Sequence, residues 1–389
     1  MSLAFERGQV RFHATSAFPG IFREGDAMNV TRTVSERGRL LVNMGDRLIL
    51  KGYRWLLAGV HPELEMSRFL TEKTNFTHIA QLAGTVEYVN AEGECSTLAI
   101  LERYAENQGS AWAHAQDYLA RYLDDFRTRQ RRPIDARHAV YTALAKTLGL
   151  RTAEFHQALA QPDTAGAFGM EPVTPDDIAE WVSNVRAQMD LMYTLLKAEL
   201  PRLPEAARAA AQDLLEARPR FYRRMMRVVA AEMDAMKARC HGDYNLRQVW
   251  LSNNDFLITN YGGGLERAWR ERRWKHSPLR DIAGMLFSFS EAAAAALAHV
   301  TAEYPDAGPA LREQTDNWQA LATDAFFKSY LRAMKEHPLF PSSPATVETL
   351  VTLFLVEKTV AAASHALAQQ STTVDIPMRQ LIQLMRPKR

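Results

Sequence analysis

The chain has 389 residues, 47% of them hydrophobic and 24% charged, which is an ordinary composition for a globular protein with room for two or three packed units. Its 47 basic and 45 acidic residues give a net charge of +2, so neither nucleic acid nor an anionic membrane is expected as the main partner. Two cysteines exclude a disulfide framework and a cysteine zinc site. The start lacks the pattern of a signal peptide, and the apolar run 292–298 is too short to span a bilayer, so we expect a cytoplasmic protein.

The first third of the chain has the pattern of short strands and turns. Gly45-Asp46 is a turn signal between two apolar runs, and Pro62 is suited to the first turn of a helix. Strands are predicted at 39–43, 48–51, 85–89 and 97–104, with a helix from 62 to about 71. This order predicts a small antiparallel sheet that carries one helix.

From about residue 110 apolar residues recur at helical spacing, and Thr174-Pro175-Asp176-Asp177 is a clear helix start. Helices are predicted at 111–128, 135–160, 174–199, 204–238, 278–302, 308–336 and 344–369. Two strand-like pieces, 249–251 and 256–259, interrupt the helices around a turn at Asn253-Asn254. The sequence therefore predicts a helical lobe with one inserted hairpin.

These patterns predict an α+β protein with the two-lobed arrangement of protein kinases, a small antiparallel β-sheet N-lobe followed by a large, mostly helical C-lobe. We expect the N-lobe to span residues 33–109 and the C-lobe residues 110–389, with a catalytic-loop hairpin at 241–264. Kinase chemistry requires a lysine that reaches the phosphates, a carboxylate that orients the attacking hydroxyl, and metal ligands.

Lys51 ends the second predicted strand and is the candidate for the phosphate-reaching lysine. Glu65 in the following helix is its expected ion-pair partner, with Glu63 as the second choice. A solvated lysine at a strand end is the alternative interpretation of Lys51.

His241-Gly242-Asp243 lies between a long helix and a short strand, where a catalytic loop is expected. Asp243 could act as the base toward a sugar hydroxyl, and Gln248 stands where such loops place an amide ligand for the metal. An ordinary turn is the alternative, which the adjacent hairpin makes less favourable.

Asn260 stands where kinase-like enzymes have a second metal ligand, an aspartate that starts a glycine-containing loop. Magnesium that bridges phosphates is normally held by carboxylates, so a neutral amide should weaken its binding. Asp255 and Glu266 are the nearest acids, but neither has the right place in the strand-loop order. A lone glycine run is a weak phosphate signal, and we interpret 262–264 as a flexible loop.

Five segments together resemble the maltokinases, including the maltokinase-like domains fused to trehalose synthases of the amylase type. The segments are GDRLILKGYR (45–54), HPELEMSRFLTE (61–72), ENQGSAWAHAQDYLARYL (106–123), HGDYNLRQVW (241–250) and SPLRDIAGMLFSF (277–289), and the similarity covers about residues 9–383. The resemblance implies the aminoglycoside-phosphotransferase-like kinase fold, transfer of the terminal phosphate of ATP to maltose with Mg²⁺, and residues 1–32 as a remnant of an N-terminal cap. It assigns Lys51 and Glu65 to the nucleotide site, Asp243 to catalysis, and Gln248 with the degenerate Asn260 to the metal.

The chain departs from the family pattern at four places: the phosphate-covering loop at 34–39, Asn245 in place of a histidine, Asn260 with the glycines after it, and the sugar-binding helix at 357–366. Two hypotheses follow. The chain is a sugar kinase for maltose or for another small sugar or amino sugar, or it is a pseudokinase that serves as a structural or regulatory partner of an amylase-family trehalose synthase. Asp281 is expected to brace the catalytic loop, and neither His241 nor His276 is expected to bind a metal.

Overall fold

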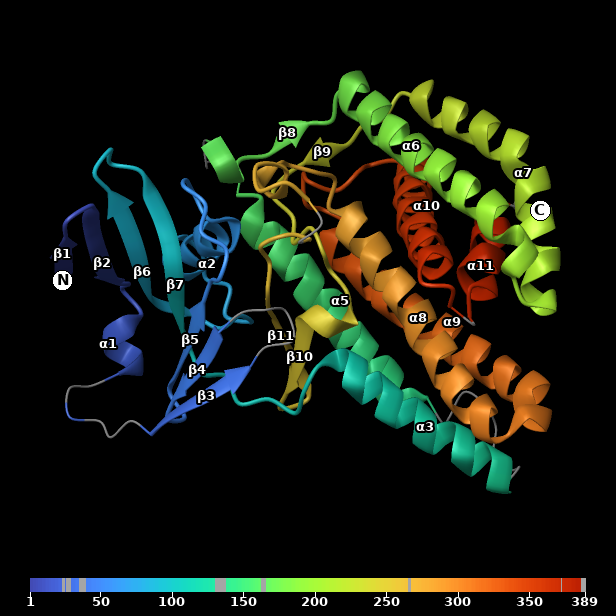
Figure 1. The fold of residues 1–389 in the computed structure, drawn as a ribbon, viewed down its shortest axis with the longest axis horizontal. Coiled ribbons are helices and arrows are strands. Elements are labelled where there is room, and N and C mark those ends of the chain that lie inside the picture. The colour runs from blue at the N-terminus through green and yellow to red at the C-terminus, as the bar shows by residue number, and fades with distance from the viewer. Residues whose placement is uncertain are drawn as a thin grey trace.

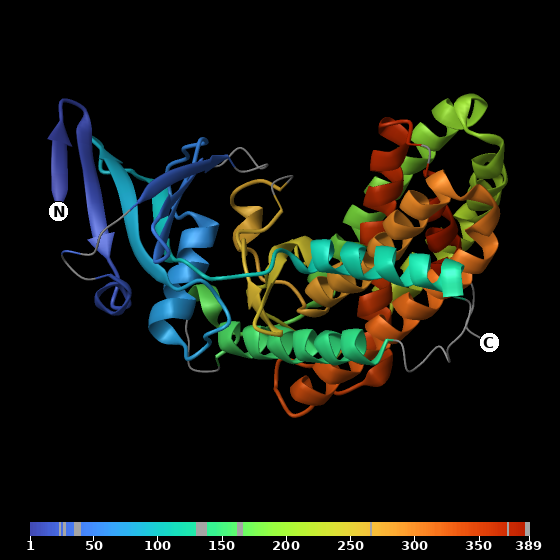
Figure 2. The same ribbon diagram turned by 90° about the horizontal axis from the view of Figure 1, so that it is seen from below.

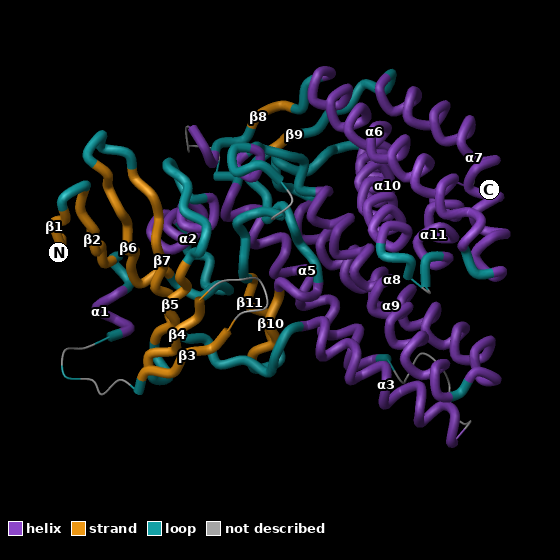
Figure 3. The backbone as a smooth tube through the Cα atoms, viewed as in Figure 1, coloured by secondary structure: helices purple, strands orange, loops and turns teal. Residues whose placement is uncertain are grey.

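A seven-stranded antiparallel sheet forms one end of the protein, and a group of long helices forms the other (Figure 1). Figure 3 shows that the strands of this sheet gather at the end that carries the N-terminus, whereas helices make up most of the other end. The structure is a computed structural model that describes residues 1–22, 25, 29–34, 40–129, 138–161, 166–264, 267–371 and 373–385. The expected fold class is confirmed.

The sheet has the strand order β1-β2-β6-β7-β5-β4-β3. Its strands are β1 (Ser2–Phe5), β2 (Gly8–Ala14), β3 (Val30–Val34), β4 (Leu40–Met44), β5 (Leu48–Gly52), β6 (Leu82–Asn90) and β7 (Cys95–Arg103). Both predicted hairpins are present, as β4–β5 and β6–β7. Strands β1, β2 and β3 were not predicted. Because β2 pairs along β6, residues 8–14 belong to the same sheet, and the boundary drawn at residue 32 stays a prediction.

Helix α2 (Pro62–Lys73) connects the sheet to the helical lobe. Pro62 occupies its first turn as predicted, and the Nδ1 atom of His61 accepts the N–H of Leu64 at 3.3 Å, which caps the helix. Further along α2, the ring of Phe69 stacks on Phe168 of the helical lobe with 3.8 Å between ring centroids. The helix is thereby fixed against both lobes.

The helical lobe contains α3, α5 to α11 and two short strands. The helices are α3 (Ala111–Arg129), α5 (Ala139–Leu159), α6 (Pro175–Glu199), α7 (Glu205–Val229), α8 (Leu279–Glu303), α9 (Gly308–Met334), α10 (Pro344–Ala368) and α11 (Asp375–Met385). The two strands are β8 (Glu171–Pro172) and β9 (Met236–Lys237). A short helix outside this lobe, α1 (Phe18–Ile21), lies beside the sheet. The predicted helix 204–238 is too long. Helix α7 ends at Val229 because the chain must extend to pair β9 with β8. Helix α11 was not predicted.

Helices α8 and α10 are long and apolar enough to cross a membrane when judged by length and composition alone. In the protein they are core helices, since 61% and 56% of their most apolar 18-residue windows are buried. Fully buried side chains such as Phe289 on α8 and Phe354 on α10 belong to one continuous hydrophobic core of the helical lobe.

The inserted hairpin of β10 (Val249–Ser252) and β11 (Asp255–Ile258) lies between the two lobes (Figure 2). Asn253 and Asn254 form its turn with φ of 52° and 60°, the left-handed backbone that a two-residue hairpin needs and that asparagine tolerates. The N–H of Ile258 donates to the carbonyl of His78 at 2.8 Å, which ties the hairpin to the N-lobe side of the junction.

The packing of α5 on α9 depends on Gly149. A Cβ at this position would lie 2.2 Å from the backbone oxygen of Phe326, which cannot move without displacing α9. Replacing Gly149 with alanine should therefore cost about 1–3 kcal/mol of stability, measured by urea denaturation. The matched control is Gly308→Ala at the start of α9, where a Cβ meets only Thr301 at 3.7 Å. An equal loss in both variants would contradict this explanation.

Candidate active site

Lys51 is buried and forms two ion pairs, to Glu102 at 2.7 Å and to Glu63 at 3.4 Å. Both carboxylates are themselves buried, and Glu63 also accepts the hydroxyl of Tyr53 at 3.0 Å. Lys51 is therefore not a solvated strand-end residue. Glu102 was missed by sequence reasoning, although an acid on the same strand face as the buried Ile100 was an available signal.

The expected pairing of Lys51 with Glu65 is corrected, because Glu63 takes that position. Residues two apart on a helix point to different sides. Glu65 instead binds Arg239 at 2.6 Å and Arg273 at 2.7 Å. Burial alone would raise the pKa of Glu65, but the hydrogen bonds from Arg273 and Arg239 outweigh it and lower the pKa. Glu65 thus joins α2 to the chain on either side of the catalytic loop.

The backbone of the catalytic loop is held by Asp281 of α8, as predicted. One oxygen of its carboxylate accepts the N–H of His241 at 2.7 Å, and the other accepts the N–H of Gly242 at 3.0 Å. His156 of α5 approaches the same carboxylate at 3.2 Å. Burial by itself would raise the pKa of Asp281, yet these hydrogen bonds and the nearby imidazoles lower it.

His241 supports the loop from inside. Burial lowers the pKa of His241, which favours the neutral ring. Because a carbonyl can only accept, Nε2 donates to Thr259 at 2.9 Å, and Nδ1 accepts the N–H of Asp243 at 3.3 Å. His276 is also buried and contacts Arg280. Among the described residues no group of three or more His, Cys, Asp or Glu side chains could hold a metal ion.

A chain of directed hydrogen bonds joins the three polar residues predicted for catalysis and metal binding. The carboxylate of Asp243 can only accept, so Gln248 presents its Nε2 to Oδ2 of Asp243 at 3.1 Å. This orientation turns Oε1 of Gln248 toward Asn260, whose Nδ2 donates to it at 3.0 Å. The other oxygen of Asp243 accepts Nδ2 of Asn245 at 3.1 Å. We call Asp243, Gln248 and Asn260 the amide relay.

The loop after β11 packs against both α2 and the catalytic loop. Asn260 begins it with a left-handed φ of 58°, and the hydroxyl of Tyr261 lies 3.2 Å from Ser67 of α2. A Cβ on Gly262 would meet Glu63 at 3.0 Å, and one on Gly242 would meet Gly263 at 3.1 Å. The glycines therefore permit close packing of this loop, which has neither helix nor strand at 262–264 as expected, and its flexibility stays a prediction.

A cavity of about 130 Å³ lies between the lobes at the place expected for a nucleotide. Leu41 and Ile49 of the sheet line one side, Trp250 and Ile258 of the inserted hairpin line the other, and Lys51 and Asn260 are also in its wall. Ligand sites usually measure about 300–1,000 Å³, so this cavity is smaller than a typical ligand site. The predicted phosphate-covering segment 34–39 lies mostly outside the described residues, as does Glu266.

On the other side of Asp243 lies a group of charged residues that sequence reasoning missed. The guanidinium of Arg247 sits 3.3 Å from the ring centroid of Trp112 and 3.7 Å from the carboxylate of Glu291. The pKa of Glu291 is raised, mainly because the carboxyl group is partly buried. The positive charges of Arg247 and Lys358 lower this pKa, and the negative charge of Asp243 raises it further. These side chains come from α3, the catalytic loop, α8 and α10, so no single sequence segment revealed them.

The remaining acids near the hairpin have structural partners. Asp255 forms two hydrogen bonds with Arg151 of α5, at 2.9 and 2.7 Å, and is therefore engaged away from Asn260. Glu357 on the predicted sugar-binding helix binds Arg280 and Arg267. Cys240 is a buried thiol, as expected.

No protein-family model matches the chain. Among solved structures, a glucosamine kinase is similar over 97% of this chain and 80% of its own, with 19% sequence identity and a TM-score of 0.71. A glucosamine kinase in complex with glucosamine, ADP and inorganic phosphate matches over 97% and 79% with 20% identity and the same TM-score. A GDP complex of aminoglycoside 2'-phosphotransferase-IIIa matches 94% of both chains at 15% identity, with a TM-score of 0.45. The first two similarities show a shared two-lobed kinase fold.

Replacement of Asp281 by asparagine should destabilise the protein by about 3 kcal/mol at neutral pH, because one backbone N–H would then face an amide donor. Since the pKa of Asp281 is lowered from its ordinary 3.8, its contribution is complete above that value and is lost as the pH falls below it. Urea denaturation from about pH 7 down to about pH 2 should therefore show that the variant loses less stability than the wild type below pH 3.8. The control is Asp324→Asn, which removes an exposed pair with Lys328. Equal effects of the two changes would contradict the bracing role.

Proposed function

We propose that this chain is a pseudokinase: a kinase-like module that keeps the phosphate-facing lysine and the catalytic aspartate but has lost magnesium-dependent phosphate transfer. The observation that carries the proposal is the amide relay. The Nδ2 group of Asn260 donates to the oxygen of Gln248 that would otherwise be available to a cation. An aspartate at position 260 would place a carboxylate oxygen, which can only accept, beside Oε1 of Gln248. A cation would then have to bridge these two oxygens.

The residues present do not fit a magnesium ion. Magnesium requires oxygen ligands in near-octahedral geometry and is usually held by one or two carboxylates. In the relay only Asp243 is a carboxylate, and both of its oxygens accept amide hydrogens from Gln248 and Asn245. Binding a cation there would break these hydrogen bonds without adding a second negative charge.

The charges around Lys51 also oppose a bare triphosphate. Glu63 at 3.4 Å and Glu102 at 2.7 Å already pair with the ammonium group of Lys51. A phosphate at this place would have to compete with both buried carboxylates for the ammonium hydrogens of Lys51. This arrangement supports weak nucleotide binding or none, and it agrees with the small volume of the cavity between the lobes.

A second candidate function is phosphorylation of a small amino sugar. It is favoured by Glu291, whose pKa is raised in part by the nearby charge of Asp243 and which could accept a hydrogen bond from an ammonium group on the acceptor. The fold similarity to glucosamine kinase supports the same class of acceptor. Maltose, which the maltokinase resemblance implies, stays a prediction, as does a partner enzyme of the amylase family.

Asn260→Asp tests the pseudokinase proposal. The wild type should show no rise in melting temperature with millimolar ATP that depends on Mg²⁺, whereas the variant should show one, because ligand binding to the native state stabilises it. The control is Asn254→Asp, the same change at an exposed position with a similar φ of 60° in the hairpin turn. A magnesium-dependent shift in the wild type equal to that of Asn260→Asp would overturn the proposal.

The amino-sugar candidate is tested by measuring ADP release with glucosamine, glucose and maltose as acceptors. If the chain is a kinase of this class, glucosamine should be the preferred acceptor. The change Glu291→Gln should raise its KM about tenfold, equivalent to the loss of one charge-assisted hydrogen bond. Turnover of none of the three sugars above background would reject this candidate and favour the pseudokinase.

A further inference from the structure

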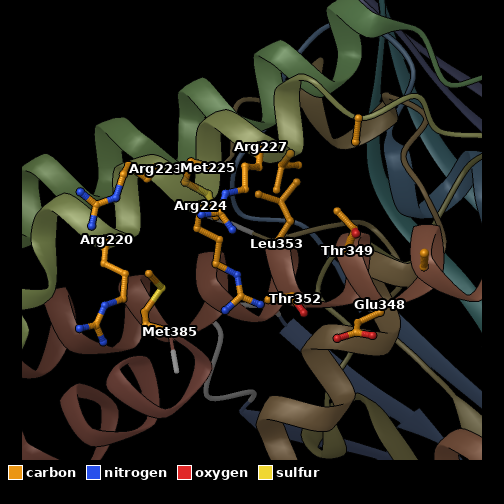
Figure 4. A pocket seen from close by; sticks show the side chains of 13 residues that line it. Arg220, Arg223, Arg224, Met225, Arg227, Glu348, Thr349, Thr352, Leu353 and Met385 are labelled. Carbon is orange, nitrogen blue, oxygen red and sulfur yellow. The ribbon is translucent and has the colours of Figure 1, made fainter. Parts of the chain in front are cut away.

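A second cavity lies in the helical lobe, between α7, α10 and α11 (Figure 4). It has a volume of about 690 Å³, within the range of sites for small ligands. Arg220, Arg223, Arg224 and Arg227 line it from α7. We refer to it as the arginine cavity.

The four arginines follow one another at intervals of three, one and three residues, which places them on a single face of α7. Within the described part of the chain, Arg220, Arg223 and Arg227 have no acidic side chain within ion-pair distance. Arg224 donates to the backbone oxygen of Leu384. Like charges at this spacing repel one another, so the stripe costs stability unless an anion relieves it.

The walls of the cavity are not uniformly charged. Met225, Val228, Leu353 and Met385 supply apolar surface, and Thr349 and Thr352 of α10 supply hydroxyl groups. Glu348 is the one acid among its described lining residues. Figure 4 shows Arg220 and Arg224 extending from α7 into the space beside Met385 and Thr352. A cationic rim over an apolar floor suits an organic anion better than a bare inorganic ion.

We propose that the arginine cavity binds a small organic phosphate that carries more than one phosphate group. Guanidinium groups match the geometry of phosphate oxygens and bind them through paired hydrogen bonds. Arg220 and Arg227 are seven residues apart, roughly 10 Å along the helix, so two phosphate groups can each contact a different pair of arginines. The threonine hydroxyls and the apolar floor contact the carbon skeleton between them.

Thermal denaturation with fructose 1,6-bisphosphate tests the proposal without relying on any kinase activity. The wild type should gain several degrees in melting temperature at millimolar ligand, and the gain should shrink as the salt concentration rises. Uncharged fructose should not change the melting temperature. Inorganic phosphate should raise it much less than the bisphosphate does. The absence of any shift with the bisphosphate would overturn the proposal, and an equal shift with inorganic phosphate would reject recognition of an organic phosphate.

Matched variants locate the site. The triple change Arg220→Gln, Arg223→Gln and Arg227→Gln should weaken binding of the bisphosphate at least tenfold, measured by calorimetry. A control triple, Arg121→Gln, Arg312→Gln and Arg332→Gln, removes the same charge from exposed positions on α3 and α9 and should bind as the wild type does. Equal losses in both triples would show a non-specific charge effect and overturn the site. Binding of an acidic peptide, but of no small phosphate, would assign the surface to a protein partner and also overturn it.

Discussion

The arrangement of the site depends on the carboxylate of Asp281, whose two oxygens accept the backbone N–H groups of His241 and Gly242. A buried carboxylate is costly unless its oxygens are satisfied, and here two backbone N–H groups and an imidazole satisfy them. The same contacts fix the direction in which the catalytic loop leaves the core. Asp243 therefore projects from a backbone that α5 and α8 hold in place, whatever the side chains around it do.

On this fixed backbone, the orientation of the amide groups determines which atoms of the site donate and which accept hydrogen bonds. An asparagine differs from an aspartate by one donor group and one charge, and the amide relay uses both differences. Asn260 turns a potential ligand oxygen of Gln248 into an occupied acceptor. At the other end of the cavity, two buried acids compensate Lys51. The kinase-like fold is thus retained, while Gln248 and Lys51 are both engaged by neighbouring side chains.

Much of the fold could be predicted because its signals are local. Turn residues marked the hairpins, including the Asn253-Asn254 turn, and the role of Asp281 was expected from its place in a kinase-like fold. Strand β1 was missed because all of its residues are exposed, which leaves no alternation of buried and exposed positions to detect. Glu63 and Glu65 could not be ranked, since the orientation of α2 about its axis depends on packing against the other lobe. Glu291 and Lys358 meet only in three dimensions.

Helix α10 runs from the arginine cavity to the surroundings of the catalytic loop. Ala345 and Leu353 line the arginine cavity, and Glu357 and Lys358 stand near the catalytic loop, roughly 20 Å from the start of the cavity along the helix axis. Thermodynamic linkage is reciprocal, so a ligand that displaced α10 at one end would alter affinity at the other, and an acceptor bound beside Lys358 would alter the cavity to the same degree. The two sites thus share one helix, although different residues of it line each of them.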